Sequence, residues 1–260
     1  MAGDRSAGRR RRHDADAGGD RETLAAKAAL REQIWADLDR PGIARFPKPA
    51  NRIPNFVGAE AAARRLADTD EWAGASTLKS NPDSPQWTVR QLALRDGKVV
   101  YMAVPRLAEH DPFFLLDPAH LADDPRTASS IKGAARSART VNIDELQPVD
   151  LVVTGCVGVD EAGARLGKGG GFSDLELAVA AEAGLVNADT VVVTTVHERQ
   201  VLAGGDVPTT DHDLHVDVIV TPDRVLRCPR PRGWMLPRIR WEDLTEEKIG
   251  SIPLLGRLRR

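Results

Sequence analysis

The chain has few of the residues that build disulfide-rich or membrane-embedded folds. It has two cysteines, Cys156 and Cys228, which cannot form a disulfide framework. No apolar run approaches the roughly 20 residues that span a bilayer, and no signal-peptide pattern opens the chain. The formal net charge of −2 gives no whole-chain argument for a nucleic-acid or membrane partner. We therefore expect a cytoplasmic protein without either partner, acting as a monomer or a homodimer.

Apolar residues are scarce at the start of the chain. Arg9 to Arg12 form a basic run, and Asp14, Asp16 and Asp20 follow it. Such a composition cannot bury enough apolar surface to fold. We predict that residues 1–20 are a disordered tail, although an arginine run can also contact RNA or an anionic surface.

The rest of the chain alternates between helical and strand-like patterns. Helical periodicity marks residues 22–38, 58–67 and 86–94, and residues 129–138 read as a basic helix or an exposed loop. Strand-like apolar runs cover residues 99–104, 151–155, 190–196 and 216–221. This alternation predicts an α/β fold of three layers, with a mostly parallel sheet and helices on both faces. We expect residues 21–222 to form this domain and residues 223–260, rich in Arg and Pro, to pack on it as a C-terminal extension.

The segment from Arg165 to Asp174 carries the strongest chemical signal. Four of the five residues from Gly167 to Gly171 are glycines, which let backbone N–H groups approach a ligand. Arg165 and Lys168 add positive charge, and the helix predicted to follow adds its dipole. The pattern indicates a phosphate-binding loop, and Asp174 is placed to hold a magnesium ion beside phosphates.

Two common phosphate-binding loops are excluded, and a simpler alternative remains. No Gly-Lys-Ser/Thr triplet follows the glycines, so the segment is not a Walker A loop. It also lacks the Gly-x-Gly-x-x-Gly spacing of dinucleotide-binding folds. A glycine cluster taken alone can be a mere turn or linker.

Three segments together resemble a known family. Arg165 to Asp174 looks like the nucleotide loop of the 5-formyltetrahydrofolate cyclo-ligases, also called methenyltetrahydrofolate synthetases. Lys27 to Arg31 resembles their N-terminal Lys-x-x-Leu-Arg helix, and Val207 to Asp217 resembles their later Val-Pro…Asp…Asp segment. Lys79 to Gln86 and Ser251 to Leu255 look like one branch, the methenyltetrahydrofolate synthase domain-containing proteins. The similarity extends over nearly everything from about residue 22 onward.

The resemblance implies a fold, a reaction and a set of site residues. The fold is Rossmann-like, of the type shared with NagB, RpiA and CoA transferases. The reaction is the ATP-dependent conversion of 5-formyltetrahydrofolate to 5,10-methenyltetrahydrofolate, with release of ADP and phosphate. Asp174 and Asp213 would place Mg²⁺, and Lys168 and Arg165 would act in catalysis. The ATP-binding residues implied are Lys27, Arg31, Arg165, Gly167, Lys168, Gly169, Gly170, Gly171, Phe172 and Ser173.

Two departures from the family keep a second function open. Phe172 and Ser173 stand where the active ligases have two tyrosines that help enclose the folate. The acidic folate-contacting residue is also not evident, since Lys79 to Trp87 offers only Asp83. The substrate is therefore a reduced folate or a related N-acyl compound. The alternative is a nucleotide-binding regulatory or scaffold protein that kept the fold and lost folate chemistry.

Overall fold

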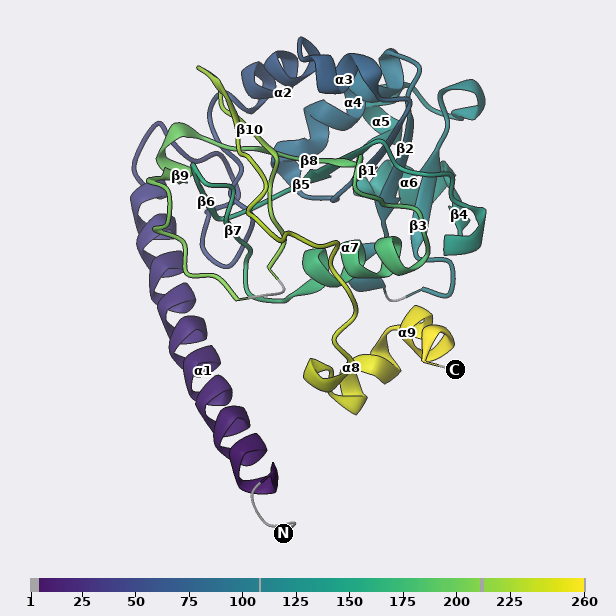
Figure 1. Ribbon diagram of the computed structural model, residues 1–260. Coiled ribbons are helices and arrows are strands. Elements are labelled where there is room, and N and C mark those ends of the chain that lie inside the picture. Colours follow the sequence, from purple (N-terminus) through teal and green to yellow (C-terminus); the bar gives the residue numbers. More distant parts are fainter. Residues whose placement is uncertain (1–4, 108, 211–212, 260) are drawn as a thin grey trace.

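An eight-stranded sheet with the order β11-β10-β8-β5-β1-β2-β3-β4 forms the centre of the computed structural model, which describes residues 5–107, 109–210 and 213–259 (Figure 1). Its strands are β1 (Thr77–Ser80), β2 (Val99–Ala103), β3 (Phe113–Leu116), β4 (Arg139–Val141), β5 (Leu151–Thr154), β8 (Val191–Thr195), β10 (Val218–Val220) and β11 (Val225–Arg227). The five strands from β10 to β2 run parallel, and β11, β3 and β4 are antiparallel at the two edges. The predicted mostly parallel sheet is confirmed, with antiparallel edges that the sequence did not suggest.

Helices cover both faces of this sheet. In Figure 1, α2, α3 and α4 lie above the sheet and α7 lies below it, and Ala134 of α6 packs in the same apolar cluster as α2 and α4. The α-helices are α1 (Arg5–Leu38), α2 (Ala59–Ala67), α3 (Asp70–Gly74), α4 (Trp87–Arg95), α5 (Pro125–Ala128), α6 (Ile131–Ser137), α7 (Phe172–Glu182), α8 (Glu246–Ser251) and α9 (Pro253–Leu258). Short 3₁₀ helices are η1 (Ser84–Gln86), η2 (Pro105–Leu107), η3 (Pro118–His120), η4 (Ile143–Glu145), η5 (Glu198–Gln200) and η6 (Trp241–Asp243). Residues 131–137 are thus a helix, which decides between the two predicted states of that segment.

The period-2 alternation of β5 shows how the three layers form. Leu151 and Val153 pack in one apolar cluster with α2 and α4, whereas Val152 packs in the opposite cluster with α7. Both faces of the strand are buried, and each buried Val or Leu contributes about 1.5–3 kcal/mol. The predicted three-layer α/β architecture is therefore confirmed.

The chain also forms a small second sheet of three strands, two of which lie between β5 and the glycine-rich segment in the sequence. It has the order β7-β6-β9, with β6 (Gly158–Asp160), β7 (Arg165–Leu166) and β9 (Val201–Leu202). Ile34 and Leu38 of α1 pack against it, beside Leu166. Along the chain, the β6–β7 hairpin separates β5 from the glycines, and the sequence analysis did not predict these two short strands.

Helix α1 includes residues that we expected to lie outside the fold. It begins at Arg5, within the predicted tail of residues 1–20, while residues 1–4 lie outside the described part of the chain. The disorder of this tail and the domain boundaries at 21 and 223 stay predictions. Within the described ranges, no helix combines the length and the apolar character that crossing a membrane requires.

Candidate functional site

The glycine-rich segment is a thin wall between two cavities. It joins β7 to α7, and Gly169 and Gly171 adopt positive φ angles of 100° and 65°, a region that side chains disfavour. Gly167, Gly169 and Gly171 line the first cavity, of about 440 Å³. Lys168 and Gly170 line the second cavity, of about 560 Å³. Alternate residues of one loop thus face different cavities.

The first cavity is rich in positive charge. Among the described residues, three carboxylates line it, those of Asp174, Asp213 and Asp243. They face six cationic side chains from α1, β7 and the C-terminal extension, namely Lys27, Arg31, Arg165, Arg238, Arg240 and Lys248. An excess of cations in a cleft attracts a polyanion.

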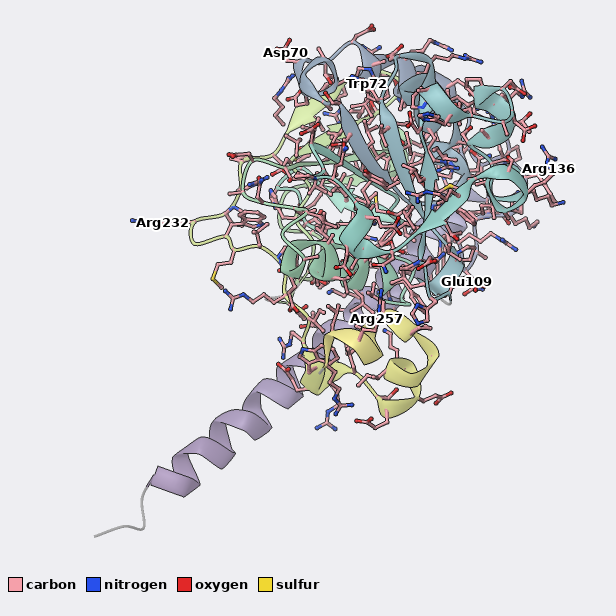
Figure 2. All side chains as sticks on the ribbon, turned by 90° about the vertical axis from the view of Figure 1, so that its right-hand side faces the viewer. Asp70, Trp72, Glu109, Arg136, Arg232 and Arg257 are labelled. Atoms are coloured by element: carbon pink, nitrogen blue, oxygen red, sulfur yellow. The ribbon has the colours of Figure 1, made fainter. Side chains whose placement is uncertain are left out.

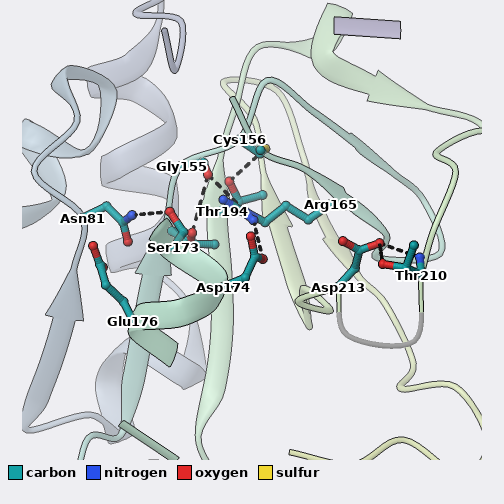
Figure 3. A network of polar contacts seen from close by, with 12 residues as sticks. Asn81, Gly155, Cys156, Arg165, Ser173, Asp174, Glu176, Thr194, Thr210 and Asp213 are labelled. Carbon is teal, nitrogen blue, oxygen red and sulfur yellow. Dashed lines mark hydrogen bonds and ion pairs between the residues drawn. The ribbon is translucent and has the colours of Figure 1, made fainter. Parts of the chain in front are cut away.

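Arg165 fixes the loop to the main sheet and to α7. Its side chain is 3% exposed. The Nε atom donates to the carbonyl of Gly155, at the end of β5, over 3.1 Å. Its Nη1 atom pairs with Asp174 Oδ1 at 2.9 Å, in the first turn of α7 (Figure 3). One buried guanidinium therefore holds three segments in register.

Helix α1 brings two further cations to the same cavity. Arg31 Nε donates to the carbonyl of Gly167 over 2.6 Å, so the helix is tied to the glycine loop. Burial lowers the pKa of the Arg31 guanidinium, and the negative charge of Asp213 opposes that shift. Lys27, one turn earlier, is buried and forms an ion pair with Asp213. The i, i+4 spacing of Lys27 and Arg31 puts both on one face of the helix.

Asp213 is held by its own segment as well as by Lys27. Its Oδ2 accepts from the backbone N–H of Thr210 at 2.6 Å and from the Thr210 hydroxyl at 3.0 Å (Figure 3). Asp211 and His212, between them, lie outside the described residues. The carboxylate is thus positioned before any ligand arrives.

The two predicted magnesium ligands suit a metal that is shared with phosphates. In the ranges that the structure describes, no group of three or more His, Cys, Asp or Glu side chains could hold a metal ion alone. Asp174 Oδ1 pairs with Arg165 and Asp213 Oδ2 with Lys27, which leaves the other oxygen of each carboxylate for a cation. Mg²⁺ is commonly held by one or two carboxylates together with substrate phosphates. The donor set fits such an ion.

The second cavity has a different chemistry. Glu176 of α7 lines it and forms a buried ion pair with Lys79 of β1. Beside it, the Asn81 amide donates to the Ser173 hydroxyl over 2.8 Å (Figure 3). Lys168 Nζ lies 3.6 Å from Asp83 Oδ1 at its rim. Both carboxylates of its lining, Asp83 and Glu176, are thus paired with lysines, and the neutral Asn81 amide and Ser173 hydroxyl lie in the same lining.

The structure divides the predicted site residues between the two cavities. Lys27, Arg31, Arg165, Asp174 and Asp213 meet at the first cavity, as do Gly167, Gly169 and Gly171. Those that line the second cavity are Lys168, Gly170, Phe172 and Ser173. The roles assigned to all of them stay predictions.

Sequence reasoning missed several residues of both cavities. Lys79 and Glu176 are charged residues inside otherwise buried elements, and that mismatch was the signal that could have found them. Asn81 lies within the segment Lys79 to Gln86, which carries the family resemblance, but that resemblance assigned it no role. Arg238 and Lys248 carry no comparable signal, because nothing local in the extension connects them to a loop some 70 residues earlier in the printed sequence.

Comparison with known proteins identifies the family to which most of the chain is similar. A sequence model of the 5-formyltetrahydrofolate cyclo-ligase family matches residues 23–222. The methenyltetrahydrofolate synthase domain-containing proteins of Mus musculus and Bos taurus are 39% and 38% identical over 238 residues, which is 90% of this chain. The chain spans only 63% and 62% of those two proteins.

One solved structure supports the fold. The NMR structure of Aquifex aeolicus 5,10-methenyltetrahydrofolate synthetase aligns with a TM-score of 0.51 at 20% identity, over 80% of this chain and 96% of that one. Similarity at this identity concerns the fold alone, whereas the family match covers residues 23–222, which include the lining of the second cavity and that of the first up to Asp213. The chain therefore belongs to the 5-formyltetrahydrofolate cyclo-ligase family.

Proposed function

We propose that this protein is an ATP- and magnesium-dependent cyclo-ligase. It converts 5-formyltetrahydrofolate, or a related N-acyl compound, to 5,10-methenyltetrahydrofolate or the corresponding cyclic product, and releases ADP and phosphate. The observation that carries the proposal is the glycine loop, which borders a cation-rich cavity on one side and a second polar cavity on the other. The transfer requires the acceptor oxygen in the second cavity to contact the terminal phosphate of the nucleotide at the edge of this loop.

The chemistry asks the protein for positioning and charge neutralisation. The formyl oxygen of an N-acyl folate is a poor leaving group until it carries a phosphoryl group. Phosphoryl transfer to that oxygen, attack by N10 and ring closure then expel it as phosphate. Little covalent chemistry falls to the enzyme in such transfers, so fixed cations and backbone N–H groups suffice.

Five charged side chains of the first cavity have a role in this proposal. Lys27 and Arg31 hold the phosphates from helix α1, and Arg165 keeps the loop in place and adds a third cation. The loop backbone and the start of the 11-residue helix α7 supply N–H donors. Asp174 and Asp213 hold Mg²⁺ directly or through water, and the ion neutralises part of the phosphate charge.

Lys168 belongs to the acceptor side. Its ammonium group stands at the rim of the second cavity, 3.6 Å from Asp83. From there the ammonium group can stabilise the negative charge of the phosphoryl group while that group is transferred from the nucleotide to the acceptor. This position supports the catalytic role that the family resemblance implies for it.

Thermal stability measured with Mg-ATP, and then with Mg-ATP plus 5-formyltetrahydrofolate, tests the proposal. Each ligand should stabilise the protein, by about 2.7 kcal/mol at 100 times its dissociation constant. ADP release should be slow with ATP alone and rise when the folate is added. Lys168→Ala and Asp174→Ala should both lose that rise. No stimulation by any reduced folate would sink the proposal.

A second function has one specific observation in its favour. Phe172 and Ser173 face the second cavity at the positions where the family resemblance implies folate-enclosing tyrosines. A cavity altered in this way suits a nucleotide-binding regulatory or scaffold protein without folate chemistry. That function predicts stabilisation by Mg-ATP with neither turnover nor a further effect of the folate. Folate-stimulated ADP release would remove it.

A further inference from the structure

The C-terminal extension, residues 223–260, forms one wall of the first cavity. Half of the six cations that line this cavity come from it, and all three lie beyond residue 222, where the family match ends. These are Arg238, Arg240 and Lys248. The cavity is incomplete without the extension.

This wall is packed against the domain. Arg230 bonds to both carboxylate oxygens of Asp217, at 2.6 and 2.9 Å, and so ties the start of the extension to the sheet. The backbone N–H of Ile239 donates to Glu182 at the end of α7 over 2.7 Å. Ile249 and Leu255 are buried in the same apolar cluster as α7. Figures 1 and 2 show α8 and α9 on the side of α7 away from the sheet, with Arg257 at the junction.

Lys248 reaches from this wall to the glycine loop. Its Nζ atom lies 3.3 Å from the carbonyl oxygen of Gly170 and 5.2 Å from the centre of the Phe172 ring. A carbonyl and an aromatic face attract a cation without neutralising it. No carboxylate pairs with Lys248 in the part of the chain that the structure describes. Its charge is therefore available to an anion.

The three cations of the extension are not equivalent. Arg240 is engaged by Glu242 and Asp243, at 3.3 and 2.8 Å. Arg238 is exposed and lies farther along the wall, between the first cavity and a neighbouring one. Lys248 alone lies against the loop, next to Gly170 and Phe172, which border the second cavity. Its ammonium group therefore lies at the part of the first cavity that adjoins the second.

We infer that the extension is the second half of the nucleotide site and that Lys248 binds the terminal phosphate of a nucleoside triphosphate. This inference rests on the proposed function, because the ligand of the first cavity is taken to be Mg-ATP. Lys248 contacts the terminal phosphate from the side opposite to α1. The α- and β-phosphates belong to Lys27, Arg31 and Arg165, so the extension distinguishes a triphosphate from a diphosphate.

Calorimetric titration of the full-length chain with Mg-ATP and with Mg-ADP tests this assignment. The Lys248→Ala variant loses one charge-assisted hydrogen bond to the nucleotide, so its affinity for Mg-ATP should be about tenfold lower than that of the unsubstituted chain. Its affinity for Mg-ADP should be nearly unchanged. Lys248→Arg should recover most of the ATP affinity. Arg259→Ala is the matched control, because Arg259 lies on the same extension, pairs with Glu246 at 2.8 Å and does not line the cavity. Lys248→Gln keeps the side-chain length and serves as the second variant should the alanine variant melt early without ligand.

The outcomes separate this inference from the proposed function. If the unsubstituted chain binds Mg-ATP and Lys248→Ala binds it equally well, the inference is overturned and the proposed function stands. Equal losses of ATP and ADP affinity would overturn the terminal-phosphate assignment. If the unsubstituted chain binds no Mg-ATP, the proposed function fails first and the inference fails with it.

Discussion

The two cavities on either side of the glycine loop differ in charge more than in size. Counted over the residues that the structure describes, the first presents six cations against three carboxylates. The charged groups that line the second are balanced, Arg52 and Lys168 against Asp83 and Glu176. An unbalanced cavity selects a polyanion by its field, and a balanced one selects a neutral polar ligand by hydrogen-bond geometry. One loop thus separates two kinds of recognition, and substitutions on its two sides should have separable effects.

The largest expected effect is on the balanced side. Lys79→Met leaves Glu176 buried and unpaired, which should lower the free energy of unfolding by about 3–5 kcal/mol. Mg-ATP affinity should change little, because neither residue lines the first cavity. Denaturant unfolding and calorimetry measure the two quantities. The double variant with Glu176→Leu should recover most of the stability; if it is no better than the single variant, the buried pair is not the cause.

Two adjacent residues offer a sharper test. Asp174 lines the first cavity and Ser173 the second, although they are neighbours in the first turn of α7. Asp174→Asn removes a charged partner worth about 1.5–3 kcal/mol, so Mg-ATP affinity should fall roughly 10–100-fold. Ser173→Ala should leave it within about threefold, a difference below 1 kcal/mol. Calorimetric titration with Mg-ATP measures both affinities. An equal loss of affinity in the two variants would contradict the inference that the two cavities bind different ligands.

The conformation of the glycine loop can be tested against that of a glycine outside it. Gly171 has a φ of 65° at the N-cap of α7, so Gly171→Ala forces a side chain into the left-handed region at a cost of about 1–2 kcal/mol. Gly256 lies inside α9 with open space where a Cβ would stand. Gly256→Ala should therefore raise stability by about 0.5–1 kcal/mol. Thermal unfolding of both variants measures the contrast, which a loss in Gly256→Ala would contradict.

The smallest expected effect lies outside both cavities. Burial lowers the pKa of His197, which caps η5 and packs edge to face against Phe56. As the pH falls below about 6.5, the unfolded chain binds a proton that the folded chain resists, so the free energy of unfolding decreases. Above that pH both states are neutral at this residue and the contribution is constant. His197→Asn keeps the cap and should flatten this part of the curve of stability against pH; an unchanged slope would assign it to other groups.

Much of the fold could be predicted because it depends on local pattern. The continuous apolar runs that became β5 and β8 can be buried only in the middle of a parallel sheet, and the pattern at 58–67 and 86–94 gave α2 and α4. The hairpin β6–β7 was missed, because strands of two or three residues owe their existence to tertiary contacts with α1 and β9.

The candidate site was predictable only in part, for a similar reason. The motif predicted Asp174 near the start of a helix, because the first turn of a helix favours acidic residues. The family resemblance added Lys27 and Asp213. Neither the motif nor the resemblance showed that Lys168 and Arg165 face different cavities, because that depends on the course of the loop backbone. Nor could either of them pair Lys79 with Glu176, since opposite charges 97 residues apart meet only after the sheet has formed.

The glycine loop borders both cavities, and this has a thermodynamic consequence. If the loop closes around a ligand in one cavity, the shape of the other cavity also changes, because alternate residues of the same backbone line both. The affinities of the two ligands are then linked, and the factor by which one alters the other is equal in both directions. Reciprocal titrations, each with the other cavity filled, measure that factor directly.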